Sequence, residues 1–437
     1  MVKMTGKLSL RIFLAGVAVC YLLIVLVSCT RKVVQPAPAD RNMSFLYNPS
    51  SSPLHPEFTV YHEGRDYSRL YLKVYPSELL FNQANKEGTF QSRLQVRFEI
   101  REIIEGRESE MITDSSTIIY TLKMDEIKNA FIASIKVKSE MGRKYMLQVF
   151  TDDLLRNKGT ANYIPLDRSS MSTAQNFKVL SATTGSPVFN KVFHSGDIFR
   201  LQYRGAQADK LVVKYFTNRF PLPRPPVTNL QSPRPDFIPD SIFSYPYSDT
   251  SFFLLPRQGM YLLQVDPGQP GGLALFNFGE DFPRVSSVEE MVGPLAYLTS
   301  AIEFNELASQ TNPKMAVDNF WLRSAGNVEK ARELIRIYYN RVFFANYYFT
   351  SYKEGWKTDR GMMYIIYGPP NTMKKNAQSE TWTYYRKRSR EPLRFTFTRV
   401  ESPYTDNDFM LVRNFVNSMW VQAVQDWRNG KVFFAEN

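Results

Sequence analysis

Residues that could do chemistry are sparse along this chain of 437 residues. It has three histidines, and none of His55, His62 and His194 is close to another in the sequence. The chain contains no His-x-x-x-His, Cys-x-x-Cys, Gly-x-Ser-x-Gly or phosphate-binding loop, so zinc, thiol, acyl-transfer and nucleotide chemistry lack their usual sequence support. We therefore expect no metal site, no cofactor and no catalytic set of these kinds.

A pair of carboxylates is the best remaining case for catalysis. Glu354 and Asp359 could act as acid and nucleophile in glycoside cleavage, which needs a defined separation between two carboxyl groups. Spacing along the sequence does not specify that separation. Asp359 beside Arg360 in a turn bounded by glycines more often forms a cap or an ion pair. We therefore expect a protein that is not an enzyme, with binding or processing of peptidoglycan or another glycan as the alternative.

Turn-forming residues surround this carboxylate pair. Gly355 and Gly361 would tolerate positive φ, and Thr358 could bond a nearby backbone amide. The pair Pro369-Pro370 cannot continue a β ladder. The apolar run 362–367 between the two turns is therefore expected to form a strand.

The run Gly355-Trp356-Lys357-Thr358-Asp359 resembles the motif that names the GWxTD domain. The resemblance extends from about residue 292 to the C-terminus, and it includes an upstream aromatic helix at 338–349. It implies an exported protein and names no reaction. A fainter likeness, a Gly-x-Pro turn followed by Trp-x-Tyr, is similar to small lipoproteins of outer-membrane barrel assembly machinery. The candidate signature and interaction residues are Gly355, Trp356, Thr358, Asp359, Arg360, Tyr367, Gly368, Pro369, Pro370 and Trp382.

Two tryptophans of this region have alternative roles. Trp356 and Trp382 could form an aromatic platform for a glycan or a peptide. Large aromatic side chains also dominate protein cores, and we favour buried rings for both residues.

The N-terminus predicts export and lipidation. Lys3, Lys7 and Arg11 precede an uncharged stretch at 12–30, as in a secretory signal. Leu26-Val27-Ser28-Cys29 fits the bacterial lipobox, so residues 1–28 would be the signal peptide and Cys29 the lipidated first residue of the mature chain. The alternative is an uncleaved membrane helix. Residues 29–42 would be an extended tether. It begins with Thr30-Arg31-Lys32 and not with an acidic cluster, which favours the periplasmic face of the outer membrane.

The composition and patterning then predict a multidomain chain that is all-β at its N-terminus and α+β at its C-terminus. With 32 Phe and 25 Tyr against 21 Gly, aromatic residues favour strands. Period-two alternation in 70–74, 94–100, 132–137 and 145–150 predicts an Ig-like β-sandwich at 43–179. Strands near 198–203, 211–216 and 261–265 predict a second β domain at 180–280.

The second β domain contains a proline-rich insertion. Residues 220–240 hold seven prolines, which exclude helix and central strand and favour extended polyproline II. We expect an exposed loop that packs on its own domain, with a docking strap for an aromatic groove on a partner as the alternative.

Helical periodicity begins after residue 286 and starts the α+β domain at 286–437. Ser287 and Glu290 lie in a capping-box pattern, and a helix from there would carry Met291, Leu295, Leu298, Ile302 and Leu307. A longer helix is expected over 327–349, where apolar residues repeat at spacings of three and four. Residues 380–385 alternate again and would pair with a strand at 393–400.

The net charge is +12, and it falls to +9 when the three basic residues of the signal peptide are left out. More than half of the remaining charge lies in one short stretch near the C-terminus. Residues 386–399 have a net charge of +5 and predict a hairpin or a loop with a basic solvated face. The basic patch is Arg386, Lys387, Arg388, Arg390 and Arg394. We expect no nucleic acid partner in the envelope, so anionic headgroups or an acidic protein patch are the expected partners of this stretch.

Taken together, these features predict a lipid-anchored scaffold of an outer-membrane assembly or secretion system, which presents the turn at 356–360 to an envelope protein.

Overall fold

The computed structural model describes most of the chain downstream of the tether. Cys29 and the remainder of the predicted signal and tether up to Arg41 lie outside the described residues. Among the helices of the described part, none combines the length and the hydropathy needed to cross a membrane. The described ranges are 42–50, 54–83, 88–127, 129–205, 208–386, 391–413 and 418–433.

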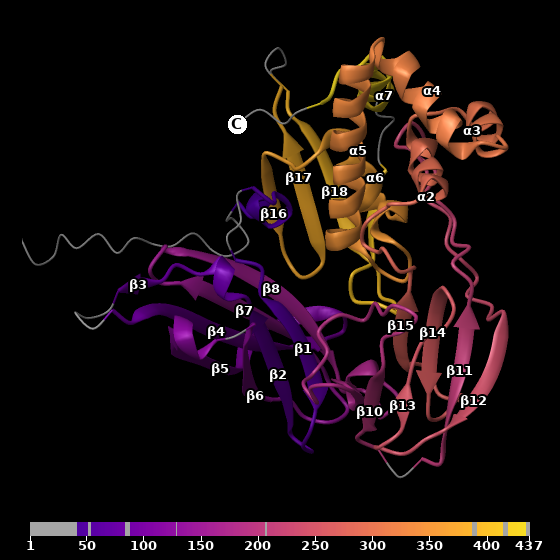
Figure 1. The fold of residues 1–437 in the computed structure, drawn as a ribbon. Coiled ribbons are helices and arrows are strands. Elements are labelled where there is room, and N and C mark those ends of the chain that lie inside the picture. The colour runs from indigo at the N-terminus through magenta and orange to yellow at the C-terminus, as the bar shows by residue number, and fades with distance from the viewer. Residues whose placement is uncertain are drawn as a thin grey trace, which may run out of the picture. The chain divides into compact units, whose positions relative to one another are not determined.

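The first β unit consists of two antiparallel sheets that enclose one apolar core (Figure 1). One sheet has the order β1-β2-β6, with bounds Glu57–His62, Tyr67–Val74 and Phe131–Lys138. The other has the order β3-β4-β7-β8, with β5 paired to β4. Its bounds are Asn82–Gln83 (β3), Phe90–Ile104 (β4), Arg107–Lys123 (β5), Lys144–Asp153 (β7) and Lys158–Asp167 (β8).

The alternation in the sequence explains why these strands pack as they do. Along β2 every second residue is buried, so Leu70, Leu72 and Val74 enter the core. A residue period of two places one face of a strand inward and the other outward. The expected strands of this unit are therefore present, each extended by a few residues at its ends.

The second β unit also has two sheets. The sheet β13-β10-β9 comprises Phe252–Phe253, Phe199–Tyr203 and Phe177–Ser181, and the sheet β12-β11-β14-β15 comprises Ser241–Pro246, Lys210–Phe216, Gly259–Gln264 and Leu273–Asn277. Every residue of β14 and β15 is buried. One face of these strands lies in the core of this unit, and the other lies in a cluster that includes Tyr352 of the C-terminal domain.

The proline-rich segment connects β11 to β12 and contains neither helix nor strand, as expected. It is not simply an exposed loop. Phe220 and Phe237 pack edge-on against Tyr352, with ring centroids 5.1 and 5.0 Å away, and Pro223 and Pro226 are buried. The segment therefore contacts both its own sheet and the C-terminal domain.

The C-terminal domain is α+β. Its sheet has the antiparallel order β16-β17-β18-β19, with bounds Thr372–Lys375, Ser379–Tyr384, Leu393–Arg399 and Phe409–Leu411. Its α-helices are α2 (Val288–Val292), α3 (Ala301–Ala308), α4 (Pro313–Ala325), α5 (Val328–Phe349), α6 (Asp359–Tyr367) and α7 (Ser418–Arg428). The 3-10 helices of the described chain are η2 (Ser44–Tyr47), η3 (Pro76–Glu78), η4 (Met124–Glu126), η5 (Ala174–Asn176), η6 (Gly293–Tyr297) and η7 (Gly355–Lys357).

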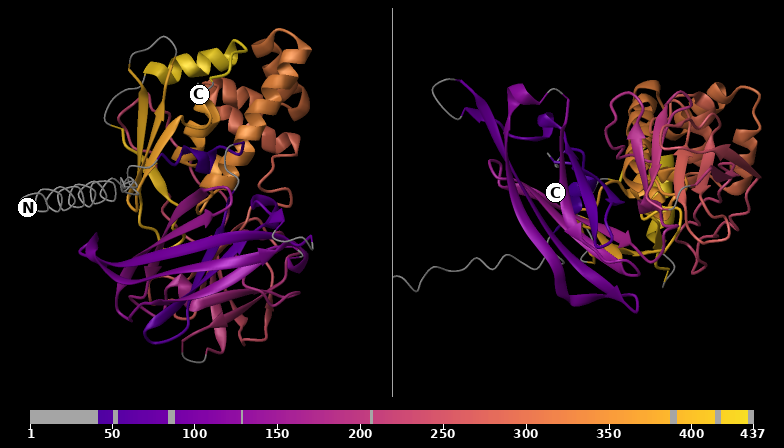
Figure 2. Two further views of the ribbon diagram at one scale, coloured as in Figure 1. Left: turned by 90° about the vertical axis from the view of Figure 1, so that its left-hand side faces the viewer. Right: turned by 90° about the horizontal axis from the view of Figure 1, so that it is seen from below.

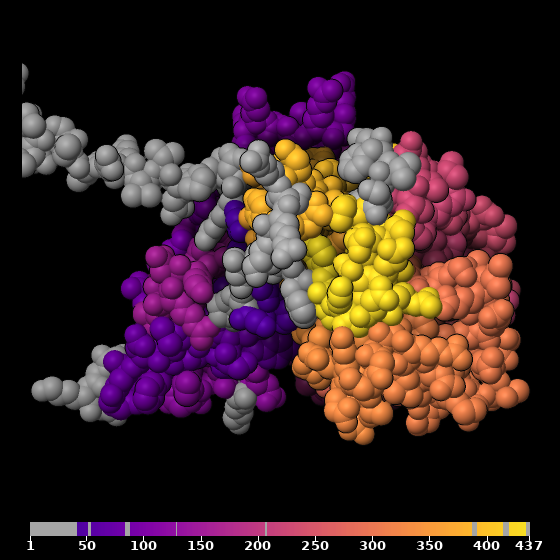
Figure 3. All heavy atoms as spheres, turned by 90° about the horizontal axis from the view of Figure 1, so that it is seen from above, coloured from indigo at the N-terminus to yellow at the C-terminus, as the bar shows by residue number. Residues whose placement is uncertain are grey.

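The helices cover one face of this sheet (Figures 1 and 2). Trp382 of β17 and Phe397 of β18 point into the core, where Trp382 contacts Phe349 of α5 at 5.4 Å between ring centroids. In Figure 3 the yellow α7 lies against the orange helices. Trp427 of α7 contacts Trp321 of α4, with ring centroids 6.3 Å apart. Aromatic rings therefore join the helical layer to the sheet.

One predicted helix is confirmed as a continuous helix, whereas another is divided into three shorter ones. The helix expected over 327–349 is α5, whose first turn is capped by the side chain of Asn327. The helix expected from residue 287 begins as predicted, because Ser287 accepts a hydrogen bond from the Glu290 amide. It then divides into α2, η6 and α3, since Pro294 lies two residues after the end of α2.

The strand expected at 362–367 is wrong, because these residues belong to α6. All nine residues of this helix are buried, so no polar face marks a helical period. A short, wholly apolar run gives no periodicity that separates a buried strand from a buried helix.

The N-terminal residues 43–47 also depart from the expected domain division, which assigns them to the first β unit. Met43 and Tyr47 are 1% and 6% exposed and belong to the core of the C-terminal domain. In Figure 1 the indigo η2 lies beside β16.

His62 is a buried histidine of the first β unit. Its ring is buried, with Nε2 3.0 Å from the Asp167 carbonyl and Nδ1 2.8 Å from Ser68 Oγ. Because a carbonyl only accepts, Nε2 carries the proton and Nδ1 accepts from Ser68. Burial lowers the pKa of His62 from 6.5 to about 4.

We predict that the unfolding free energy falls as the pH drops from 6.5 to about 4, because the unfolded chain then binds a proton that folded His62 does not. The full loss is about 3 kcal/mol. Urea unfolding at several pH values measures it. His62→Gln should remove this part of the pH dependence, whereas His194→Gln, at a side chain 41% exposed, should retain it. Equal slopes for His62→Gln and the unaltered protein would contradict the assignment.

Candidate functional site

The GWxTD-like segment lies where the end of α5 turns back through η7 into α6. Gly355 and Gly361 have no positive φ, contrary to expectation. They are needed because the backbone is crowded. A Cβ on Gly355 would lie 1.9 Å from the Ala345 carbonyl oxygen of α5, and a Cβ on Gly361 would lie 1.9 Å from the Gly355 carbonyl oxygen. The motif glycines therefore allow three backbone segments to touch.

Thr358 fixes the start of α6. Its hydroxyl accepts a hydrogen bond from the Gly361 amide at 3.0 Å and donates to the Gly355 carbonyl at 2.7 Å. A threonine side chain at an N-cap satisfies an amide that the helix leaves unpaired. Thr358 is thus an N-cap, which agrees with the expectation that it bonds a nearby amide.

Trp356 packs beneath η6 and is half-buried. Its ring contacts Tyr297 at 6.1 Å and lies close to Gly293, and its carbonyl accepts from the Tyr297 hydroxyl at 2.7 Å. The side chain of Trp382 is fully buried. Trp382 is therefore a core residue, and its ring cannot form an exposed platform.

Asp359 forms a buried ion pair with an arginine from beyond the sheet. Arg413 donates to Asp359 Oδ1 at 2.6 Å, and the side chains are 1% and 4% exposed. Ser232 of the proline-rich segment donates to the same oxygen at 3.0 Å, and Arg413 also donates to the Arg224 carbonyl at 2.6 Å. The motif aspartate therefore holds the proline-rich segment against the C-terminal domain.

Two neighbours of the motif contact the same segment. Glu354 forms an ion pair with Lys357 at 2.9 Å and accepts from Asn218. Lys353 donates to the Pro221 carbonyl at 2.9 Å. Burial lowers the pKa of Lys353 to about 8, although the negative charges of Asp359 and Asp408 oppose this effect.

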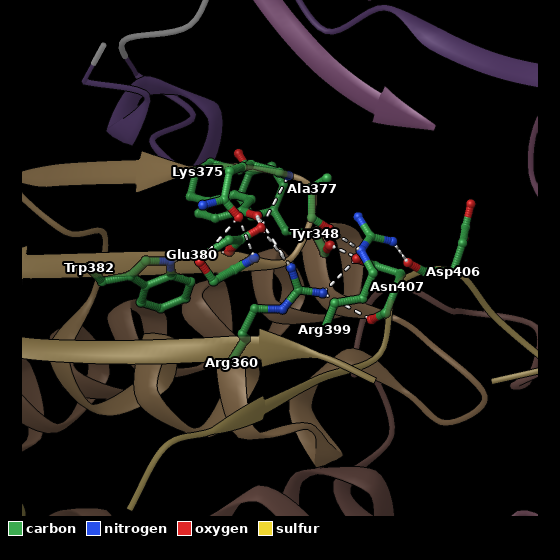
Figure 4. A network of polar contacts seen from close by, with 12 residues as sticks. Tyr348, Arg360, Lys375, Ala377, Glu380, Trp382, Arg399, Asp406 and Asn407 are labelled. Carbon is green, nitrogen blue, oxygen red and sulfur yellow. Dashed lines mark hydrogen bonds and ion pairs between the residues drawn. The ribbon is translucent and has the colours of Figure 1, made fainter. Parts of the chain in front are cut away.

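Arg360 is 1% exposed and lies at the centre of a second network (Figure 4). It bonds Glu380 Oε1 at 3.1 Å and donates to the backbone carbonyl and side chain of Asn407, at 2.9 Å to the carbonyl. Asn407 in turn donates to the Tyr348 carbonyl at 3.1 Å. The guanidinium also lies 4.1 Å from the Phe409 ring centroid. Arg360 thus connects α6 with the end of α5, β17 and β19.

Glu380 is a fully buried carboxylate that stays charged. Besides Arg360, it bonds Lys375 at 3.1 Å, the Tyr47 hydroxyl at 2.7 Å and the Trp382 indole at 3.2 Å. Burial alone would raise its pKa, but the charges of Lys375 and Arg360 and these hydrogen bonds outweigh burial and lower the pKa to about 2. Glu380 is therefore an ion-pair partner and no proton donor at neutral pH.

The turn after α6 is likewise bonded within the domain. Tyr367 is buried and contacts Phe395 at 5.2 Å. Gly368 has φ of 78°, where glycine is favoured, and its carbonyl accepts from the Tyr384 hydroxyl at 2.9 Å. Pro370 is buried and Pro369 half-buried. These signature residues end α6 and lead into the sheet.

The basic stretch at 386–399 begins after β17 and includes β18, and these two strands pair antiparallel. Lys387, Arg388 and Arg390 lie outside the described residues. Arg394 is exposed on β18, whereas Arg399 donates to the Ala377 carbonyl at 2.7 Å. Arg386 contacts the Met419 sulfur at 3.2 Å. The described members of this stretch therefore do not share one solvated face.

The Trp356–Arg360 turn, which we expect to be presented to a partner, exposes few of its polar groups. Thr358, Asp359 and Arg360 are each at most 5% exposed, and their side chains bond within the protein. The carboxylates of Glu354 and Asp359 are both already paired. This arrangement neutralises charge and fixes segments in place.

Sequence reasoning missed the partners of these groups. Arg413, Asn407, Ser232 and Tyr47 come from four separate places, and Tyr47 is 313 residues away from Arg360. No local pattern marks them. A buried aspartate and arginine inside an apolar region could have signalled that partners exist, because buried charges are paired.

Together, the sheet, the helical layer and the buried turn define an α+β domain organised around a Gly-Trp-x-Thr-Asp segment. Residues 259–429 match the sequence model of the GWxTD domain, so this part of the chain is a GWxTD domain. The match begins in β14, upstream of the expected boundary at residue 286. It therefore includes the two strands whose outer face packs near Tyr352.

Comparison with curated proteins gives no match. Among solved structures, the chain is similar over 36% of its length to a glycosyl hydrolase family 2 member from Bacteroides cellulosilyticus DSM 14838, with 11% identity and a TM-score of 0.19. It is also similar to a putative beta-galactosidase from Bacteroides fragilis, with 13% identity and a TM-score of 0.17. It covers only 18% and 19% of those chains. Such TM-scores establish no shared fold.

We predict that Gly361→Ala destabilises the C-terminal domain by several kcal/mol, or prevents its folding, because the new Cβ meets backbone that cannot move aside. Gly196→Ala is the matched control, since a Cβ there meets no atom within 4 Å. It should change the unfolding free energy by about 0.5 kcal/mol or less. Thermal and urea unfolding of both variants measure the difference, and equal stabilities would contradict the crowding argument.

We also predict that Asp359→Asn costs about 3–5 kcal/mol, because it leaves Arg413 buried without its counterion. Asp318→Asn is the control. It removes an exposed ion pair with Lys314, whose side chains are 46% and 73% exposed, and should cost at most about 1 kcal/mol. Chemical denaturation of both variants is the measurement. Similar losses at the two positions would show that the Asp359 pair does not stabilise the fold.

Proposed function

We propose that this chain is a lipid-anchored protein of the bacterial cell envelope that acts without catalysis, as an interaction or scaffold component of an outer-membrane assembly or secretion system. The observation that carries the proposal is the bonding of the motif. Asp359 and Glu354, the best catalytic candidates, are ion-paired and covered by the proline-rich segment. Their role is then to join the second β unit to the GWxTD domain.

The proposed anchor is Cys29 in the lipobox Leu26–Cys29, at the end of an apolar run that stops as a signal peptide does. The proposed site is the periplasmic face of the outer membrane. We also assign the two β units to the Ig-like class, on the basis of paired antiparallel sheets around single cores. Modules of this kind commonly serve as binding or spacing units.

A partner would contact exposed groups other than the motif. Phe252 and Leu254 are 66% and 45% exposed, and Ile198 is 52% exposed. Phe253 and Phe199 pair and are buried, so strand alternation places Phe252 on the outer face of the sheet. Leu254 and Ile198 are the next residues along the chain from this buried pair. Three adjacent exposed apolar side chains favour a protein interface. The hairpin that carries Arg394 would add contacts to an acidic patch or an anionic headgroup.

The test is crosslinking in intact cells, followed by purification through a C-terminal tag and mass spectrometry. We predict a stoichiometric set of envelope proteins. Phe252→Asp should lose partners, whereas Ile302→Asp, at a residue 75% exposed on α3, should keep them. Recovery of a monomer bound only to glycan fragments would favour the glycan-binding alternative and reject the scaffold.

The anchor has a separate test. We predict that Cys29→Ala abolishes incorporation of labelled palmitate. Cys20→Ala is the control, because Cys20 lies inside the predicted signal peptide and should leave lipidation unchanged. Palmitate labelling that persists in Cys29→Ala would contradict the lipobox assignment.

A further inference from the structure

Residues 42–47 contact the GWxTD domain in the way a bound peptide contacts its receptor. The Met43 amide donates to the Met373 carbonyl of β16 at 2.8 Å, and the Asn42 side chain accepts from the Met373 amide at 2.9 Å. Ser44 Oγ donates to the Asn371 carbonyl at 3.0 Å. The segment therefore adds one backbone and two side-chain hydrogen bonds at the open edge of β16, before it turns into the 3-10 helix η2.

Tyr47 fills a site that recognises both ends of a tyrosine. Its ring lies among Tyr348, Phe349 and Trp382, with centroids 5.3, 4.8 and 5.5 Å away. Its hydroxyl donates to Glu380 at 2.7 Å, and its carbonyl accepts from the Tyr364 hydroxyl at 2.9 Å. Aromatic side chains around the ring and a charged acceptor at the hydroxyl match the phenol of tyrosine, which is apolar along its ring and donates one hydrogen bond.

The residues that surround Tyr47 are also held in place by contacts that do not involve residues 42–47. Glu380 keeps its ion pairs with Arg360 and Lys375 and its bond from Trp382 when Tyr47 is disregarded. All of these residues lie within 259–429, the range that matches the GWxTD domain, whereas residues 42–47 lie far outside it. The site thus belongs to the domain, and its occupant comes from elsewhere in the chain.

We propose that the GWxTD domain carries a peptide-binding groove, formed by the β16 edge and the Tyr47 site, and that residues 42–47 are its ligand in this chain. The ligand class is a short peptide with an apolar residue four positions before a tyrosine, as in Met43 and Tyr47. This proposal does not depend on the proposed envelope role, because it concerns contacts within the described chain.

The experiment uses the full chain with a protease recognition sequence inserted between Ser50 and Leu54. After cleavage of the folded protein, a fluorescein-labelled peptide of residues 42–50 is added, and anisotropy measures its exchange into the groove. We expect the cleaved fragment to remain bound and to exchange with the labelled peptide at micromolar concentrations.

Three peptide variants give specificity. Tyr47→Phe should bind roughly tenfold more weakly, because it loses a hydrogen bond to a charged carboxylate. Tyr47→Ala should show no measurable binding. Ser50→Ala is the matched control and should bind like the native peptide, because Ser50 is exposed.

Several outcomes would overturn the proposal. One is a cleaved protein that stays folded, releases the fragment and does not bind the labelled peptide. Another is equal binding of the Tyr47→Ala peptide. A third is loss of the folded domain on cleavage, shown by circular dichroism, because residues 42–47 would then be an integral part of the core.

Discussion

The buried positive charge of Arg360 is the constraint on which the GWxTD domain depends. A guanidinium that is removed from water needs a counterion and acceptors for its donors. Glu380 supplies the charge, and Asn407 supplies carbonyl and amide oxygens. Meeting this demand brings β17 and the loop before β19 to the N-terminal end of α6. The sheet and the helical layer are thereby fixed in one arrangement.

The adjacent Asp359 is also a buried charge that needs partners, and one of its partners comes from the preceding β unit. Its partner Arg413 lies after β19, and its second donor, Ser232, lies in the proline-rich segment of the preceding β unit. Two consecutive residues of opposite charge thus organise two different sets of contacts, one inside the domain and one toward its neighbour. The glycines on either side matter because they let this charged turn approach α5 closely enough to be buried.

The sequence allowed prediction of what is local. The spacing of Ala331, Tyr338 and Val342 and the cap at Asn327 located α5 almost to the residue. The alternation in β2 and β4 located the first β unit. Prediction failed where the signal is not local. The helix α6 has no polar face, the motif glycines serve close packing, and the partners Ser232 and Tyr47 come from distant segments whose composition suggests only loop.

The position of η2 has a mechanical consequence for an anchored chain. The twelve residues between Cys29 and Asn42 can span at most about 45 Å. If Cys29 carries the lipid, tension in this tether reaches the GWxTD domain at the β16 edge before it reaches either β unit. The hydrogen bonds of Met43 and Tyr47 would then bear the pulling force first. Force at the membrane and occupancy of the tyrosine site would be coupled through six residues.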